Sequence, residues 1–451
     1  MTNPLLTKFQ TTFEEAPFSK IKKHHYIPSI KKTIKNALDE IKVIINQKEK
    51  PSFKNTLEAV EKCGNLIGRN TSILFNLNSA ETSEELQLIA QKAAPLLSAF
   101  QNDIRLNKGL FKRIRFVYEN EDRSKLNEEQ LTLLEKEFKS FVRNGAFLNN
   151  ISKEKLRKID SRLAKLSLSF GENVLADTQA YQLHIEDEKK LKGIPPSAIE
   201  MAKIIANEKE KKGWVFTLDY PSYVPFMTYA EDRKLRKEMS IAFGKRGFQK
   251  NKNNNSSIIL EITKLRQKRA KLLGYDSHAD FILEERMAKS AKNVQNFLND
   301  LSEKAKPAAQ KEWTTMKIFA EKNLEIPNIE KWDSAFVSEK LKENQLQLNE
   351  LELKPYFQLD LVLKGLFKIV KKLYGLEFKK NTKLDRYHKE VQVFEVYRKG
   401  NFYALLYADF FPRPGKRNGA WMTSYRPQKK DQRPHISIVC NFSRPTKTEP
   451  S

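Results

Sequence analysis

The chain has 451 residues, of which 39% are hydrophobic and 31% charged, and its excess of lysine and arginine gives a formal net charge of +26. A chain of this length can bury a core without disulfides, and at roughly 150 residues per domain it predicts two or three domains. The composition excludes a disordered protein, and no apolar stretch approaches the roughly 20 residues that span a bilayer, which excludes a transmembrane protein.

The N-terminal segment has no secretory signal pattern. Residues 1–18 lack a basic stretch followed by an apolar one, so we expect a cytoplasmic protein without a membrane partner. The two cysteines, Cys63 and Cys440, lie far apart in the sequence. We therefore expect two buried free thiols rather than a disulfide or a metal pair.

Helical periodicity dominates the first half of the chain. A helix is predicted over residues 29–47, and apolar residues recur at helical spacing between residues 83 and 143. A further long helix is predicted over residues 152–173. Each apolar stripe is expected to face a core rather than a ligand.

The helical pattern weakens between residues 191 and 225, and we place a domain boundary there. Residues 213–217 predict a short strand, and residues 220–225, which include two prolines, predict a turn. The predicted domains are an N-terminal helical domain of residues 1–222 and a second domain of residues 223–451.

Near the C-terminal end of the chain, the spacing of apolar residues changes from a helical pattern to the alternating pattern of strands. Residues 391–393 and 402–411 are aromatic and β-branched runs on either side of a hairpin-type turn, in which Gly400 supplies a positive φ. Residues 420–424 and 436–440 predict two further strands. The predicted fold class is mostly α, with a small antiparallel β-sheet near the C-terminus.

Several motifs resemble one protein family. Residues 407–422 (YADFFPRPGKRNGAWM), followed by residues 439–442 (VCNF), are similar to the zinc metallopeptidases of the thimet oligopeptidase, oligopeptidase A and peptidyl-dipeptidase family. Residues 17–28 and residues 265–288 resemble the same family in the same order. The resemblance covers residues 13–442.

This resemblance implies a two-lobed helical peptidase with a deep channel that admits short peptides. It implies one zinc ion per subunit, held by an HExxH helix that should follow residue 442 and whose Glu deprotonates a zinc-bound water. No two histidines of the sequence have this spacing; they are His24, His25, His184, His278, His388 and His435. The zinc ligands are therefore expected to be absent from these 451 residues, no catalytic or metal-binding residue is assigned, and the lone chain is expected to be inactive.

The resemblance leaves one wall of the substrate channel in this chain. Gly419, Ala420 and Trp421 are the candidates for contact with the substrate backbone through β-type pairing. An alternative stays open, in which Gly419 only permits a tight turn and Trp421 only packs.

A second class of function is a metal-free binding protein that uses its basic surface. Basic residues cluster near the C-terminus: Arg417, Arg426, Lys429, Lys430 and Arg433. Such a surface attracts phosphate backbones, but no helix-turn-helix, zinc-finger or RNA-binding signature accompanies it. We therefore expect weak nucleic-acid binding without sequence preference.

Overall fold

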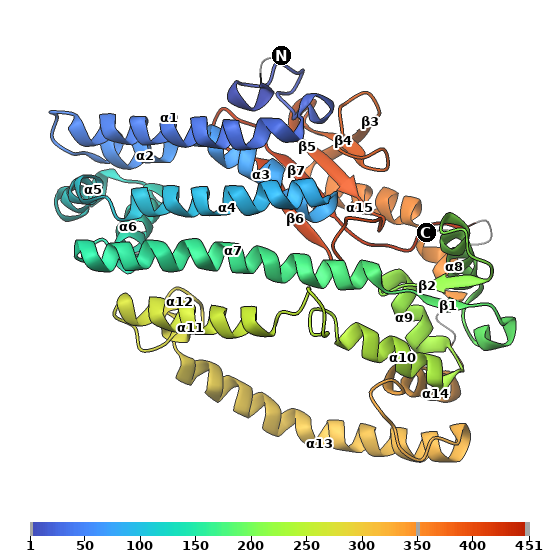
Figure 1. The fold of residues 1–451 in the computed structure, drawn as a ribbon. Helices are drawn as coiled ribbons and strands as arrows, with labels where there is room; N and C mark the ends of the chain where they lie inside the picture. Colours follow the sequence, from blue (N-terminus) through green and yellow to red (C-terminus); the bar gives the residue numbers. More distant parts are fainter. Residues whose placement is uncertain (1–2, 349–351, 447–451) are drawn as a thin grey trace. The chain divides into compact units, whose positions relative to one another are not determined.

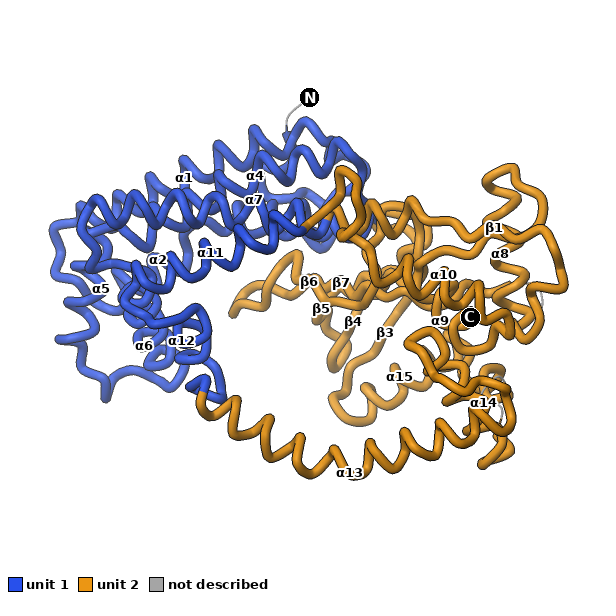
Figure 2. Tube along the Cα trace, turned by 60° about the horizontal axis from the view of Figure 1, so that its bottom comes forward, with its two compact units in different colours: residues 1–171, 256–291, 385–387 blue, residues 172–255, 292–384, 388–451 orange. Residues whose placement is uncertain are grey.

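The computed structural model describes residues 3–348 and 352–446. The chain divides into two compact units, shown in different colours in Figure 2. Unit 1 comprises residues 1–171, 256–291 and 385–387, and unit 2 comprises residues 172–255, 292–384 and 388–451. The predicted boundary after residue 222 lies within unit 2, and the predicted two-domain division stays a prediction. In the described part of the chain, no helix combines the length and the apolar character needed to cross a membrane.

Unit 1 consists of helices. A π-helical turn over Phe53–Glu58 leads into α2, and α1 packs against α3 and α4. The helices of this unit are α1 (Tyr26–Asn46), α2 (Ala59–Lys62), α3 (Asn65–Ala80), α4 (Glu84–Arg105), α5 (Lys108–Asn120), α6 (Glu128–Arg143), the first part of α7 (Asn150–Ala180), α11 (Ser256–Leu272) and α12 (His278–Leu283) (Figure 1).

Local sequence explains where several of these helices begin. Ser83 caps α4 by accepting a hydrogen bond from the Leu86 amide, and Asn107 caps α5 in the same way through the Leu110 amide. Each cap satisfies a backbone donor that the first helical turn leaves without an intrahelical partner. The helices predicted over residues 29–47 and 152–173 are confirmed as α1 and α7.

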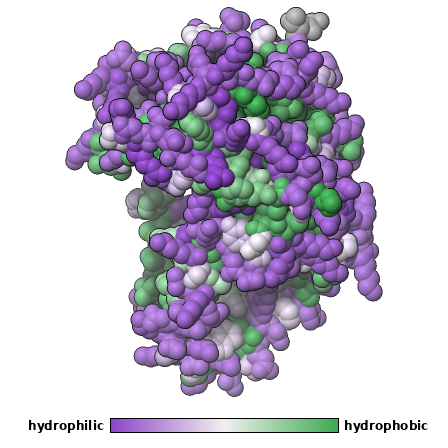
Figure 3. All heavy atoms as spheres, turned by 90° about the vertical axis from the view of Figure 1, so that its left-hand side faces the viewer, coloured by the Kyte–Doolittle hydropathy of each residue, from purple (hydrophilic) through white to green (hydrophobic). Residues whose placement is uncertain are grey.

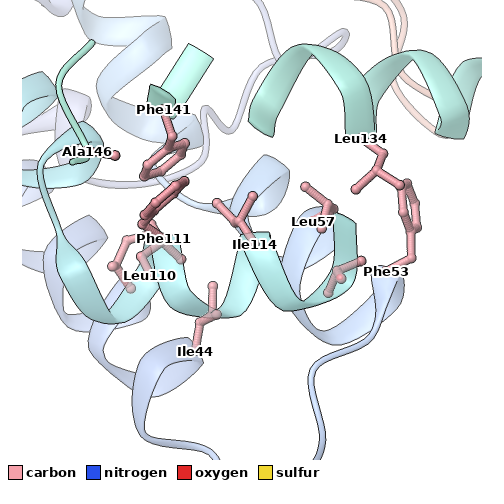
Figure 4. Packing of buried hydrophobic residues seen from close by; sticks show 11 residues of the cluster. Ile44, Phe53, Leu57, Leu110, Phe111, Ile114, Leu134, Phe141 and Ala146 are labelled. Atoms are coloured by element: carbon pink, nitrogen blue, oxygen red, sulfur yellow. The ribbon is translucent and has the colours of Figure 1, made fainter. Parts of the chain in front are cut away.

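A hydrophobic core joins α1, α5, α6 and the π-helical turn (Figure 4). Within it, Phe111 stacks on Phe141 with ring centroids 6.0 Å apart. Leu134 and Phe141, two turns apart on α6, are at most 1% exposed. The apolar stripe of residues 83–143 therefore faces a core, as its periodicity predicts.

Unit 2 contains a helical part and two sheets. Its helices are the second part of α7, α8 (Pro196–Glu208), α9 (Tyr220–Tyr229), α10 (Arg233–Gly244), α13 (Ala291–Leu324, of which residue 291 is assigned to unit 1), α14 (Ser334–Leu346) and α15 (Leu359–Tyr374). The strand predicted over residues 213–217 is confirmed as β2 (Trp214–Phe216), which pairs antiparallel with β1 (Leu183–Ile185).

The predicted turn at residues 220–225 is wrong, because these residues begin α9. Pro221 lies in the first helical turn, where its missing N–H costs no hydrogen bond. The helix continues because Phe226 and Met227 are buried in the core that covers β1 and β2. Burial of these side chains outweighs the low helix propensity of the two prolines.

The larger sheet lies near the C-terminus, as predicted. Five strands within the described residues form it in the order β3-β4-β5-β7-β6, and they are β3 (Leu376–Asn381), β4 (Gln392–Arg398), β5 (Asn401–Asp409), β6 (Trp421–Arg426) and β7 (His435–Val439). The tight β4–β5 turn has positive φ at Lys399 and Gly400. The mostly α fold class with a small sheet is confirmed.

One detail of the sheet corrects the prediction, because the pairing is not antiparallel throughout. β7 pairs with β5 in parallel and with β6 in antiparallel orientation. The 25 residues between β5 and β7 carry the chain back across the sheet and contain β6, so β7 enters between two strands that precede it in sequence. On one face of this sheet, Leu359, Leu363 and Phe367 of α15 pack against Phe394 and Ala408.

Candidate functional site

The strand β6 is an edge strand of the five-stranded sheet. Among the strands of the described residues its neighbour is β7, with Trp421 opposite Val439 and Thr423 opposite Ser437. Its first five residues, Trp-Met-Thr-Ser-Tyr, carry no charge and no proline. Edge strands are usually protected by charged residues or proline, so this edge has the chemistry of a strand that accepts another strand.

The opposite edge of the sheet is protected. β3 has the sequence Leu-Glu-Phe-Lys-Lys-Asn, in which three of six residues are charged, and α15 packs beside it. Charges on an edge strand disfavour the addition of a further strand. The two edges of this sheet therefore differ, and β6 is the less protected one.

A buried ion cluster holds the segment that leads into β6. Asp409, at the end of β5, accepts two hydrogen bonds of 2.8 Å from the Arg413 guanidinium and one of 2.8 Å from Lys416 Nζ. Lys416 also donates to the Phe411 carbonyl at 2.6 Å. The side chains of Asp409 and Lys416 are 0% exposed. Burial lowers the pKa of Lys416, and the adjacent Asp409 carboxylate acts in the opposite direction.

Asn441 fixes the turn that immediately precedes β6. Its Nδ2 donates to the Arg417 carbonyl at 3.0 Å and to the Gly419 carbonyl at 2.7 Å. Gly419 has φ +102°, a backbone conformation that side chains with a Cβ rarely adopt, although a Cβ there would meet no atom within 4 Å. Glycine is therefore needed at this position for its conformation rather than for space.

The structure places the three predicted cleft residues at the start of this edge. Gly419 and Ala420 are exposed, and Trp421 is partly buried as the first residue of β6. Their assignment to a substrate cleft stays a prediction. The sequence motif contained Asp409, Arg413, Lys416 and Asn441 without assigning them a role; the four-residue spacing of Asp409 and Arg413 was the available signal.

The histidines of the chain do not form a metal centre in the described residues. His24, His25 and His278 belong to unit 1, and His184, His388 and His435 belong to unit 2. Within residues 3–348 and 352–446, no group of three His, Cys, Asp or Glu side chains is arranged to hold a metal ion. These residues therefore do not fit the zinc that the resemblance implies, and no reaction step is assigned to a metal here.

Individual histidines have structural contacts instead. His25 Nδ1 accepts a hydrogen bond of 3.1 Å from the Lys22 amide and so helps to cap the short helical turn of residues 23–25. His278 stacks against Phe281 in unit 1, and burial lowers its pKa, with Arg266 and Arg269 contributing in the same direction.

The basic residues near the C-terminus do not all share one exposed surface. Arg417 is partly buried, its Nε is inaccessible, and burial lowers its pKa while Glu172 opposes that shift. Lys429, Lys430 and Arg433 are exposed. Nucleic-acid binding by this group stays a prediction.

Comparison with known proteins agrees with the motifs. The family model of Peptidase family M3 matches residues 226–451. The whole chain is 32% identical to oligopeptidase A of Salmonella typhimurium and of Escherichia coli, and 31% identical to dipeptidyl carboxypeptidase of Escherichia coli. In each case the alignment spans all of this chain and 67% of the relative. The resemblance read from the sequence is confirmed, and the chain belongs to peptidase family M3.

Proposed function

We propose that this chain forms the peptide-binding part of a zinc metallopeptidase of the oligopeptidase or peptidyl-dipeptidase type, which hydrolyses short peptides. Membership of a peptidase family and the names of the relatives support the reaction class. The observation that carries the binding role is β6, an edge strand whose first five residues are uncharged and which is preceded by exposed Gly419 and Ala420. A cytoplasmic location is part of the proposal, supported by a relative named probable cytosolic oligopeptidase A.

An extended peptide would pair with β6 through backbone hydrogen bonds. Such pairing gives affinity without demanding a particular side chain, which suits a peptidase that acts on many short peptides. Because side chains alternate along a strand, Trp421 and Thr423 would border one face of the bound peptide and Met422 the other. The buried Asp409 cluster and Asn441 would hold the start of β6 in place for this contact.

Zinc would supply an activated water nucleophile when bound. The proposal places its ligands outside the residues described here, and assigns to this chain the binding and orientation of the peptide. Cleavage would therefore require the remaining part of the M3 fold.

Peptide binding can be tested separately from cleavage. We expect a fluorescein-labelled oligopeptide to bind the 451-residue chain, and its copy with alternate N-methylated amides to bind about tenfold or more weakly, because each lost backbone hydrogen bond costs about 1 kcal/mol. Met422→Lys should weaken binding by charging the edge, whereas Val224→Lys, at a similarly exposed position on α9, should not. Equal binding of the normal and methylated peptides would contradict the β-pairing.

Cleavage is tested with a quenched-fluorescent peptide. We expect none from the lone chain, and zinc-chelator-sensitive cleavage once the unmatched third of a relative is supplied. Chelator-sensitive cleavage by the lone chain would show that ligands exist within it and would overturn this assignment.

A further inference from the structure

A polar pocket lies within unit 1, between α4, α7 and α11. Its volume of about 320 Å³ is at the lower end of the roughly 300–1,000 Å³ of small-molecule sites. All of its lining residues are polar, and they include Ser98, Asn102, Arg105, Asn144, Asp160 and Arg269. They all belong to unit 1, so one unit forms the pocket, and it shares no residue with β6 or the Asp409 cluster.

Contacts between helices that are distant in sequence hold this lining in place. Arg269 of α11 donates from Nε to Asp160 Oδ1 of α7 at 2.7 Å and from Nη2 to Asn144 Oδ1 at 3.1 Å. Both terminal nitrogens of Arg105 on α4 donate to the Glu137 carboxylate of α6. The charged groups of the pocket are therefore fixed before a ligand enters, which lowers the entropy cost of binding.

Asn102 is the lining residue that indicates a ligand. It is 7% exposed, yet its side-chain amide has no hydrogen-bond partner among the described residues. Buried amides in folded proteins are normally hydrogen-bonded. Neither its Oδ1 nor its Nδ2 is sealed off from solvent, so a molecule in the pocket can reach both atoms. Hydrophilic residues predominate on the face shown in Figure 3, so polarity alone does not mark a site, whereas a buried amide without a partner does.

The charges of the pocket indicate the chemistry of this ligand. Two ion pairs, Arg105 with Glu137 and Arg269 with Asp160, already balance, so neither a lone anion nor a lone cation is favoured. Each pair still has bonding capacity. Within the described part of the chain, Arg105 Nε, Arg269 Nη1 and Asp160 Oδ2 have no hydrogen-bond partner. A molecule that carries one anionic acceptor and one cationic donor complements these atoms.

We propose that this pocket binds a free polar α-amino acid. Its carboxylate would accept hydrogen bonds from Arg105 and Arg269, and its ammonium group would donate to Asp160 Oδ2. A side chain with an amide or hydroxyl group would pair with the Asn102 amide, which has both a donor and an acceptor. The inference does not rest on the proposed function, because the pocket belongs to unit 1 and β6 to unit 2.

The ligand chemistry is tested by calorimetric titration of the full 451-residue chain with L-glutamine. We expect saturable binding at one site per chain. N-acetyl-L-glutamine lacks the ammonium group and L-glutaminamide lacks the carboxylate, so each should bind at least about tenfold more weakly through the loss of charge-assisted hydrogen bonds. Met422→Lys, which charges β6, should leave the binding of L-glutamine unchanged.

The position of the site is tested by substitutions in the lining. Asn102→Leu should weaken binding about tenfold through the loss of two hydrogen bonds. It should not lower the melting temperature of the free chain, since the amide has no partner to lose. Asn70→Leu is the matched contrast: Asn70 is also buried, but its Nδ2 donates to the Leu5 carbonyl at 2.8 Å, so the melting temperature should fall.

The charged contact has a matched control on the same pair of helices. Asp160→Asn should weaken L-glutamine at least about tenfold and bring it close to N-acetyl-L-glutamine, whose binding does not use the ammonium contact. Glu261→Gln alters the other ion pair between α11 and α7, with Arg162, outside the pocket lining, and should leave binding unchanged. Circular dichroism shows that each variant is folded before it is titrated.

Several outcomes would overturn the inference. Absence of saturable binding would mean that the pocket holds water alone, and equal binding of the blocked analogues would remove the zwitterion. Displacement of L-glutamine by equal concentrations of inorganic phosphate or glycerol would assign the pocket to an anion or a polyol. Tighter binding of glycyl-L-glutamine would assign it to a peptide. Binding that Met422→Lys abolishes, or that Asn102→Leu and Asp160→Asn leave intact, would place the amino acid elsewhere.

Discussion

Replacing Asp409 by leucine should strongly destabilise unit 2. Asp409 is the carboxylate partner of Arg413 and Lys416, whose side chains are 6% and 0% exposed. Without it, two buried cations lose the carboxylate that they both contact, and removing one partner of a buried ion pair costs about 3–5 kcal/mol. Lys416→Met removes a cation but leaves the two-bond contact between Arg413 and Asp409 intact, so we expect a smaller cost of about 1–2 kcal/mol.

The assay is thermal unfolding followed by circular dichroism. For a unit of this size about 1 kcal/mol corresponds to roughly 2–4 °C, so Asp409→Leu should lower the melting temperature of unit 2 by roughly 6–20 °C and Lys416→Met by roughly 2–8 °C. Asp300→Leu removes a solvent-exposed ion pair with Lys304 in the same unit and should change this melting temperature by less than about 4 °C. The reasoning is refuted if Lys416→Met costs as much as Asp409→Leu, because the carboxylate would then not be the group on which both cations depend.

Three further predictions concern metal, nucleic acid and pH. Elemental analysis after dialysis should find no stoichiometric zinc in the 451-residue chain, because no two of its histidines have the HExxH spacing. One tightly held zinc ion per chain would contradict this expectation. A labelled oligonucleotide should bind weakly, without sequence preference, and be released as salt rises; selective binding at physiological salt would favour the basic-surface function. Burial lowers the pKa of His278 in the folded chain. Its contribution to stability is therefore fully present above pH 6.5 and is lost as the pH falls from there through the folded pKa. The melting temperatures at pH 7.5 and pH 5.0 should differ less in His278→Gln than in the wild type.

Local patterns in the sequence were sufficient to predict the elements and the family. The apolar stripes of α1, α6 and α7 are long and strongly periodic, so their helical state follows from residue spacing alone. The strands β4 to β7 were located because aromatic and β-branched runs are separated by turn residues such as Gly400. The motif around residues 407–422 identified the family, because its residue types and spacing are specific.

Tertiary structure decided what periodicity cannot express. The turn expected at residues 220–225 is helical because Phe226 and Met227 enter a core formed by segments distant in sequence. The parallel pairing of β5 with β7, and hence the position of β6 at the edge, depends on how the chain crosses the sheet rather than on any strand's own pattern.

The candidate site also depends on contacts that the sequence pattern does not express. Asp409 and Asn441 are ordinary polar residues in the sequence, and folding brings one to a buried lysine and the other to the turn before β6. The apolar positions of α15 show only that one side of the helix avoids water. Which of them the sheet covers is decided by the fold, because burial is a property of the neighbours and not of the helix itself.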